Sequence, residues 1–525
     1  MRKPLRWFGR AVMVAVLAVA WAGTAVADDL TDAAKRRDGA TVRTLIEQGA
    51  DVNTPQPDGA TALHWAAHWD DLETVRLLVE EHANVNAANE YGVTPLTLAV
   101  ADAGPALVEF LLQAGANPNA ALPSGETPLM TATRVNAPAT VTALIARGAD
   151  VKAQERSHGQ TALMWAFARG HIDIARALIE QGADIHARSN SGFTPLLFAT
   201  RHGDLEGVRF LLAQGADVNE TARDGSSVLH VATVRAHVEL AELLLARGAD
   251  PNADGPGYTP LHWAAGTWDS VTTNEYIESP PQTKGWSDEW RTLIGLQGAR
   301  KHRLVRSLLA RGADPNVKTT ASPPRFGYSF QSFVDAGGSL ASATPFMLAA
   351  MAGDAPTMRL LLEGGADPLI TTEDGTTALM VASGMTSIEE EMSAPENKRL
   401  EAVKLALDLG VDINATNTRG NTALHATALL GFPRIARYLV AERGAAVNPL
   451  NKVGETPLRV AEGTIINAMF FIHDKVADVL LSLGGTSDGS GVCTPGILKS
   501  ASVESKSTLC ETAPPAETSA EQDQP

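Results

Sequence analysis

Apolar and polar positions recur along most of the chain in one order: a Thr-Pro/Ala-Leu segment, an apolar pair such as Leu77-Leu78, and then Gly-Ala-Asp-x-Asn. A Thr can cap a helix by accepting a backbone N–H, and Pro is tolerated next to it because no donor is needed there. A Gly after the apolar pair can end a second helix in the left-handed conformation. Each unit is therefore predicted to be a pair of helices. The Thr, once replaced by Ser, stands at positions 61, 94, 127, 161, 194, 227, 259, 344, 377, 422 and 456.

One such unit cannot bury its apolar face alone, so its stability has to come from stacking on neighbouring units. Residues 30–53 keep only the second half of the pattern and are expected to form an N-terminal capping unit. With eleven complete units after it, the pattern predicts an elongated, curved, all-α solenoid over residues 28–484.

The segment Thr259-Pro260-Leu261-His262-Trp263-Ala264-Ala265 resembles the signature of ankyrin repeats, and residues 61–67 nearly reproduce it. Over roughly residues 28–484 the chain is similar to ankyrin-repeat proteins, in particular exported bacterial ones. The resemblance implies antiparallel helix pairs, each joined to the next pair by a projecting β-turn finger. It also implies binding of another protein along the concave face, and it brings no catalytic residue or ligand with it.

The period is interrupted by insertions near residues 266–298, 317–341 and 384–397. Exposed aromatic side chains beside an Arg are typical of binding hot spots, so the aromatic residues of the first two insertions are candidate binding residues. The alternative is that these rings fold back and cover the edge of the solenoid. The candidates are Trp268, Trp286 and Trp290 in the first insertion, and Arg325, Phe326, Tyr328, Phe330 and Phe333 in the second.

The residue after each finger glycine varies far more than the Thr and Leu that follow it. Variable side chains on a constant frame are expected to form the binding face. Its aromatic members Phe193 and Tyr258, with Tyr91 one place before its glycine, are candidate anchors.

Charge and composition narrow the classes of partner. The 525 residues carry a formal net charge of −17, and we find no basic run in the sequence, which argues against nucleic acid. The two cysteines, Cys493 and Cys510, rule out a disulfide-built scaffold or a cysteine-based metal ribbon. They lie in a polar tail, residues 485–525, that we expect to be largely disordered. A disulfide between them is favoured over free thiols.

Residues 1–27 have the pattern of a secretory signal peptide, with a basic start, an apolar core and a small-x-small site before cleavage between Ala27 and Asp28. An uncleaved anchor is the alternative. The mature protein is expected to be exported, to the periplasm or beyond, without insertion into the membrane, and to be monomeric.

Two motifs could carry chemistry. His64 and His68 are four residues apart on a predicted helix, a spacing that suits a metal, but His64 also occupies the histidine position of the repeat. Residues 485–489 match Gly-x-Ser-x-Gly, although no strand is predicted before Ser487. We therefore predict a non-enzymatic, cofactor-free scaffold for another protein. The alternatives are a hydrolase or metal enzyme that uses an insertion pocket, and a secreted effector that acts on another organism.

Overall fold

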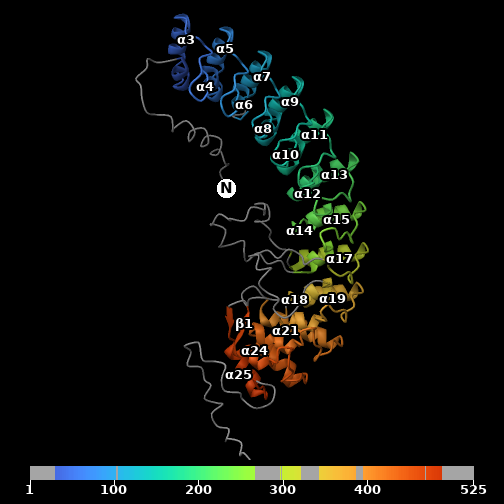
Figure 1. Ribbon diagram of the computed structural model, residues 1–525. Helices are drawn as coiled ribbons and strands as arrows, with labels where there is room; N and C mark the ends of the chain where they lie inside the picture. The colour runs from blue at the N-terminus through green and yellow to red at the C-terminus, as the bar shows by residue number, and fades with distance from the viewer. Residues whose placement is uncertain are drawn as a thin grey trace, which may run out of the picture. The chain divides into compact units, whose positions relative to one another are not determined.

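The computed structural model describes residues 30–101, 104–266, 296, 298–320, 342–385, 394–466 and 469–487 (Figure 1). The chain divides into two compact bodies, one made of residues 1–232 with 246–249 and the other of residues 233–245 with 250–525. Each body is a row of short helix pairs, and neighbouring pairs pack on one another. The chain thus has the all-α solenoid fold that the repeat pattern predicts.

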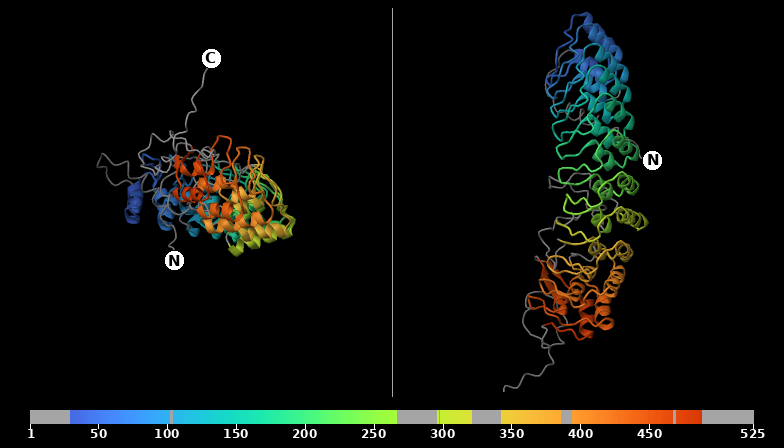
Figure 2. Two further views of the ribbon diagram at one scale, coloured as in Figure 1. Left: turned by 90° about the horizontal axis from the view of Figure 1, so that it is seen from below. Right: turned by 90° about the vertical axis from the view of Figure 1, so that its right-hand side faces the viewer.

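In the first body, the first helix of each repeat is called the inner helix and the second the outer helix. Within this body the helices stack side by side, and the loops between repeats project from one side (Figure 2). The inner helices are α2 (Leu30–Lys35), α4 (Ala62–His68), α6 (Pro95–Ala101), α8 (Pro128–Arg134), α10 (Ala162–Ala168), α12 (Pro195–His202) and α14 (Val228–Val234), which runs into the second body. The outer helices are α3 (Gly39–Glu47), α5 (Leu72–Glu80), α7 (Pro105–Gln113), α9 (Pro138–Ala146), α11 (Ile172–Glu180) and α13 (Leu205–Ala213).

The second body keeps the helix pairs but varies their lengths. Its inner helices are α16 (Pro260–Ala265), α18 (Pro345–Met351), α20 (Ala378–Ala382), α22 (Ala423–Leu430) and α24 (Pro457–Gly463). Its outer helices are α15 (Val238–Ala246), α17 (Gly298–Ala310), α19 (Ala355–Glu363), α21 (Glu396–Asp408), α23 (Pro433–Arg437) and α25 (Asp474–Ser482). The outer helices α17 and α21, which follow the first and third insertions, have 13 residues each.

Two local departures accommodate extra residues in the second body. Gly444 lies 22 positions after Thr422, one more than the usual 21, and the extra residue is taken up by the π-helical turn η4 (Tyr438–Glu442). In the last repeat, strands β1 (Thr464–Ile466) and β2 (Met469–Phe471) form an antiparallel hairpin between α24 and α25. The repeat pattern predicts no strands there, although β-branched and aromatic residues favour them.

Capping residues mark where the helices begin and end, as the sequence predicts. Thr194 Oγ1 accepts the backbone N–H of Leu197 at 3.3 Å, and Pro195 occupies the first helical position of α12. The finger glycine Gly192 has φ of +80°, and a Cβ there would lie 2.6 Å from the backbone nitrogen of Arg223 in the next finger. A side chain at that position would therefore meet both backbone strain and a clash.

Side-chain amides connect successive repeats. Asn119 Oδ1 accepts the backbone N–H of Asp150 at 2.7 Å, and its Nδ2 donates to the Gly148 carbonyl at 2.9 Å. Asp150 in turn accepts the N–H of Lys152 at 2.8 Å, which closes the turn after the glycine. The Asp of Gly-Ala-Asp is thus a turn anchor. The asparagine contact recurs at Asn53, Asn86, Asn252, Asn316 and Asn448.

No helix in these described ranges is both long and apolar enough to cross a lipid bilayer.

Candidate binding face

The variable position after the finger glycine is partly accessible in most repeats. Its side chains are half-buried at Val93, Glu126, Gln160, Phe193, Ser226, Asn421 and Glu455, and buried at Ala60, Tyr258, Ala343 and Thr376. The frame around it is fixed by caps and turns, so the described repeats differ from one another mainly at accessible positions such as these. We call the surface formed by this position and the inner helices of the first body the binding face.

Tyr91 and Phe193 lie on the first body with part of their rings accessible. The side chain of Tyr91 is 45% exposed at a finger tip, and a hydrogen bond to the Glu90 carboxylate raises the pKa of its phenol. Phe193 packs against Phe198 of α12, with the ring centroids 5.6 Å apart. Both remain candidate anchors, because an aromatic ring offers a large contact area at low entropic cost.

Arg201 extends the Phe193 cluster. Its guanidinium carbon lies 4.8 Å from the ring centroid of Phe198 and 5.7 Å from that of Phe193. Stacking on two rings restricts the positions that the Arg201 guanidinium can occupy. The sequence analysis missed Arg201, although its position three residues after Phe198 on a helix is a signal that could have found it.

Tyr258 differs from the expectation. Its side chain is only 6% exposed, and its ring lies 5.9 Å from that of Trp263, which is 4% exposed. The structure therefore places Tyr258 in the core and not among exposed anchors. The sequence could not reveal this, because the aromatic partner is a core residue that differs from repeat to repeat.

The other candidates lie outside the described residues and stay predictions. They are the insertion residues Trp268, Trp286, Trp290, Arg325, Phe326, Tyr328, Phe330 and Phe333, the cysteines Cys493 and Cys510, and the cleavage site at Ala27 and Asp28.

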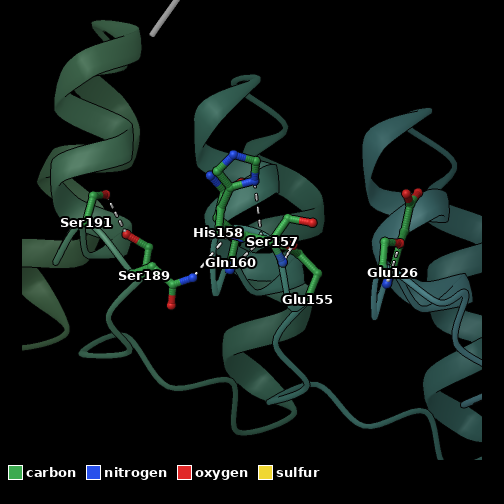
Figure 3. A network of polar contacts seen from close by, with 9 residues as sticks. Glu126, Glu155, Ser157, His158, Gln160, Ser189 and Ser191 are labelled. Carbon is green, nitrogen blue, oxygen red and sulfur yellow. Dashed lines mark hydrogen bonds and ion pairs between the residues drawn. The ribbon is translucent and has the colours of Figure 1, made fainter. Parts of the chain in front are cut away.

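The fingers beside the binding face are stiffened by internal polar contacts (Figure 3). Glu155 is 5% exposed and accepts backbone N–H groups from Ser157, His158 and Gln160 at 2.6, 2.8 and 3.0 Å. The next finger is bonded to this one, since Asn190 N donates to the His158 carbonyl at 2.7 Å. The Glu155 carboxylate therefore fixes a turn. The side chains at the variable position after the finger glycine are attached to a backbone that these hydrogen bonds hold in place.

Family models identify this architecture. A model of three ankyrin repeats matches residues 30–121, 102–189, 129–222, 196–273 and 392–485, which together are more than half of the chain. The chain belongs to the ankyrin-repeat family. A single-repeat model also matches residues 343–373.

Solved ankyrin domains are similar to parts of this ankyrin-repeat protein. The human ASB11 ankyrin repeat domain is 25% identical, covers 43% of this chain and 100% of its own, and gives a TM-score of 0.38. The ankyrin repeat domain of Bcl-3 is 34% identical, covers 39% of this chain and 93% of its own, and gives a TM-score of 0.36. Ankyrin repeats are in general scaffolds for protein–protein interaction, and proteins built from them are typically not enzymes.

The repeat explains His64 without a metal. Its Nδ1 accepts the backbone N–H of Thr61 at 3.1 Å, and its Nε2 donates to the Val93 carbonyl of the next repeat at 3.0 Å. Both ring nitrogens are thus used within the array, and burial lowers the pKa of His64. His262 and His425 make equivalent contacts, and burial lowers the pKa of His425 to about 4. Across the described ranges, no group of three or more His, Cys, Asp or Glu could hold a metal ion.

Ser487 follows the outer helix α25, whereas a hydrolase elbow requires a strand before its serine. Its hydroxyl donates to the Glu462 carboxylate at 2.7 Å, a contact that holds the end of the last repeat. The inner-helix position four residues after the motif Thr is a core position, since Trp65, Phe198, Trp263 and Leu348 are at most 4% exposed. Trp165 is the exception, because its side chain is half-buried.

Proposed function

We propose that this ankyrin-repeat protein is a non-enzymatic scaffold that binds another protein through the binding face of its first body. The observation that supports this most is the combination of a rigid frame with accessible aromatic residues. Tyr91 is 45% exposed, and Phe193 and Trp165 are half-buried, while the fingers around them are fixed by hydrogen bonds. Rigid aromatic side chains lose little entropy on binding and dominate the energy of protein interfaces.

The partner is expected to lie outside the cytoplasm. This part of the proposal rests on the signal-peptide pattern of residues 1–27, and it makes the periplasm the first compartment to search and the medium the second. The aromatic residues of the insertions are proposed as additional contacts of the same partner.

Cross-linking in cells that produce the full chain tests the proposal. An adduct with a second protein is expected, and Phe193→Ala or Trp165→Ala should reduce its yield by about tenfold or more, as for a residue central to an interface. Arg209→Ala on the outer helix α13 is the matched control, because Arg209 is exposed on another helix of the same repeat as Phe193. An adduct that neither binding-face variant weakens would place the interface elsewhere.

Two further measurements separate the finer parts of the proposal. N-terminal sequencing of protein from the periplasmic fraction should begin at Asp28, and protein retained in the cytoplasm would contradict export. The combined change Phe326→Ala, Tyr328→Ala and Phe330→Ala should weaken the adduct, whereas an unchanged yield would remove the second insertion from the interface.

A further inference from the structure

Acidic residues are unevenly distributed between the two rows of helices in the first body once the capping helix α2, which carries Asp32, is set aside. The inner helices α4, α6, α8, α10 and α12 contain no Asp or Glu. Of the outer helices, α9 carries no acidic residue, whereas α5, α7, α11 and α13 do, among them Glu73, Glu109, Asp173 and Glu206. The protein has a net charge of −17, so a row of helices without any carboxylate stands out from the rest of the molecule.

Cations gather where the inner helices end. Arg134 ends α8 with its side chain 41% exposed, Arg169 caps α10 and is exposed, and Arg201 lies in the last turn of α12. A cation at a helix C-terminus complements the helix dipole, which explains the position of each Arg. Burial of most positions explains why these helices carry no acidic residue, and it leaves the accessible positions at the ends of α8, α10 and α12 to the Arg side chains. Acidic residues do border this row, since Asp71 and Asp204 cap the outer helices beside it and Glu126 Oε1 lies 3.2 Å from Arg134.

Aromatic rings accompany these cations. Arg201 stacks on Phe193 and Phe198, and Trp165 lies half-buried on α10 between the helices that carry Arg134 and Arg201. Among the described residues, the indole N–H of Trp165 has no hydrogen-bond partner. The face therefore combines positive charge in fixed positions with apolar area.

We propose that this face binds an extended, acidic segment of the partner protein, an inference that rests on the proposed function and specifies its partner. Helices α8, α10 and α12 pack in succession, and packed helices lie about 8–10 Å apart. An extended chain rises about 3.3 Å per residue. A carboxylate at every third residue of the segment therefore meets one inner-helix Arg after another, and an apolar residue between them meets Trp165.

A protein segment fits this face better than a nucleic acid does. The phosphate charges of a nucleic acid would extend past this face. The acidic outer helices and the net charge of −17 would repel them. An acidic peptide carries carboxylates that the guanidinium groups can bind bidentately, together with apolar side chains for the aromatic rings.

Fluorescence anisotropy with a labelled peptide tests the inference on the full chain. The probe is a peptide of about 15 residues with Glu at every third position and Leu or Ala between, a length that spans about five packed helices. The control peptide has Gln in place of each Glu. The Glu peptide is expected to bind the protein, and raising the salt from about 0.05 M to about 0.5 M should weaken it by about tenfold or more.

Charge-reversal variants then locate the site. Arg169→Glu and Arg201→Glu should each raise the Kd of the Glu peptide by about tenfold or more, while Arg209→Glu on α13 should leave it unchanged. Circular dichroism and melting of each variant check that it is folded. Equal binding of the Gln peptide, an unchanged Kd for Arg169→Glu, or tighter binding of a single-stranded DNA of similar length would each overturn the inference.

Failure of the acidic-segment inference can be distinguished from failure of the proposed function. If cross-linking captures a partner that depends on Phe193 but not on Arg169 or Arg201, the binding face is correct and the acidic segment is wrong. If no partner depends on Phe193, the proposed function itself fails.

Discussion

The two bodies share one repeat but place their basic residues differently. In the first body, Arg134 and Arg169 are accessible at the ends of inner helices. In the second body, Lys301 and Arg399 are 2% and 1% exposed and reach the same helix ends from inside. Lys301 Nζ donates to the Gly266 carbonyl at 2.9 Å, and an Arg399 Nη donates to the carbonyls of Val381 and Ala382 at 3.2 and 3.1 Å.

The insertions account for this difference. In a regular repeat the chain turns at once, and a backbone N–H five residues on closes the inner helix, as Asp204 N does with the Ala199 carbonyl at 3.0 Å. In the repeats of α16 and α20, where an insertion separates the two helices, the Gly266 and Ala382 carbonyls accept side-chain donors instead. Lys301 and Arg399 lie near the start of the long outer helices that follow such insertions, and each supplies donors to the inner helix. The basic side chains at the inner-helix ends are thus accessible in these regular repeats, whereas in the two interrupted repeats they are buried and bond the inner helix.

Removing Lys301 should have the largest effect. Its Nζ also lies 2.9 Å from Asp354 Oδ2, and breaking a buried pair by removing one partner costs about 3–5 kcal/mol. Lys301→Met keeps the aliphatic length and should lower the free energy of unfolding of the second body by about 3 kcal/mol in urea titrations. Arg306→Met, at an exposed position on the same helix, should change it by less than about 0.5 kcal/mol. If Lys301→Met is as mild as Arg306→Met, the buried cation does not hold the interrupted repeat together.

The stability of a regular repeat should depend on the size of its core side chains and not on a buried charge. Phe167 of α10 is 1% exposed, and a Cβ at Gly207 of α13 would meet the Asp204 carboxylate first and the phenyl ring at 3.0 Å. Elsewhere the helix-capping Asp is followed by a Thr that hydrogen-bonds to it, as Thr357 does with Asp354 at 2.8 Å. Gly207 cannot do this, and Asp204 Oδ2 is buried without a hydrogen bond among the described residues. The Phe167 ring therefore lies beside Gly207 in a repeat that lacks this hydroxyl contact.

A double-mutant cycle in the full chain tests whether the two residues share one space. Phe167→Ala alone should cost about 3 kcal/mol of unfolding free energy, and Gly207→Thr alone about 1–3 kcal/mol because the core is overpacked. Together they should cost less than the sum by about 1 kcal/mol or more, since the Thr then fits and reaches Asp204. Additive costs would mean that the two residues do not share one space.

The sequence predicted the helix caps and turns of the repeat well. It predicted poorly which unusual side chains are buried in individual repeats. The motif Thr, the terminal Gly and the turn Asp act locally, so their roles follow from spacing alone. The burial of Lys301 and Arg399 depends on segments far along the chain, that of Tyr258 on the packing of its ring against Trp263, and composition assigns charged and phenolic side chains to the surface. The step of 22 from Thr422 to Gly444 was visible in the sequence, but only the structure shows that a π-helical turn absorbs it.

A smaller effect is expected at Glu220, a buried acid in a finger of the first body. Other repeats carry Ala at this position, including Ala87, Ala153 and Ala415. Burial raises the pKa of Glu220, which is 7% exposed and hydrogen-bonded to Thr194. The folded protein therefore holds this proton more tightly than the unfolded chain does, so the Glu220 side chain destabilises the fold increasingly as the pH rises through its folded-state pKa.

Glu220→Ala should therefore raise the free energy of unfolding by about 1 kcal/mol at neutral pH and by little at about pH 4. Melting temperatures of both proteins across this range provide the measurement. Glu155→Ala is the contrasting variant, because Glu155 accepts three backbone N–H groups, and its removal should destabilise the protein at neutral pH. A gain for Glu220→Ala that does not depend on pH would show that its charge is not the cause.

The smallest effect is expected where the asparagine contact between repeats is interrupted in each body. His186 in the first body and Leu369 in the second occupy the position that Asn119 and Asn316 hold elsewhere. Asn316 donates to the Gly365 carbonyl at 2.9 Å and accepts the N–H of Asp367 at 2.8 Å. His186→Asn and Leu369→Asn should each restore such a pair of bonds and add about 0.5–1 kcal/mol to the free energy of unfolding, with the matching Ala variants as controls. If the two gains are equal, the insertions leave the frame between repeats unchanged, and the bodies differ only in how each repeat closes its inner helix. A gain confined to the first body would mean instead that the interruptions also alter how neighbouring repeats fit together.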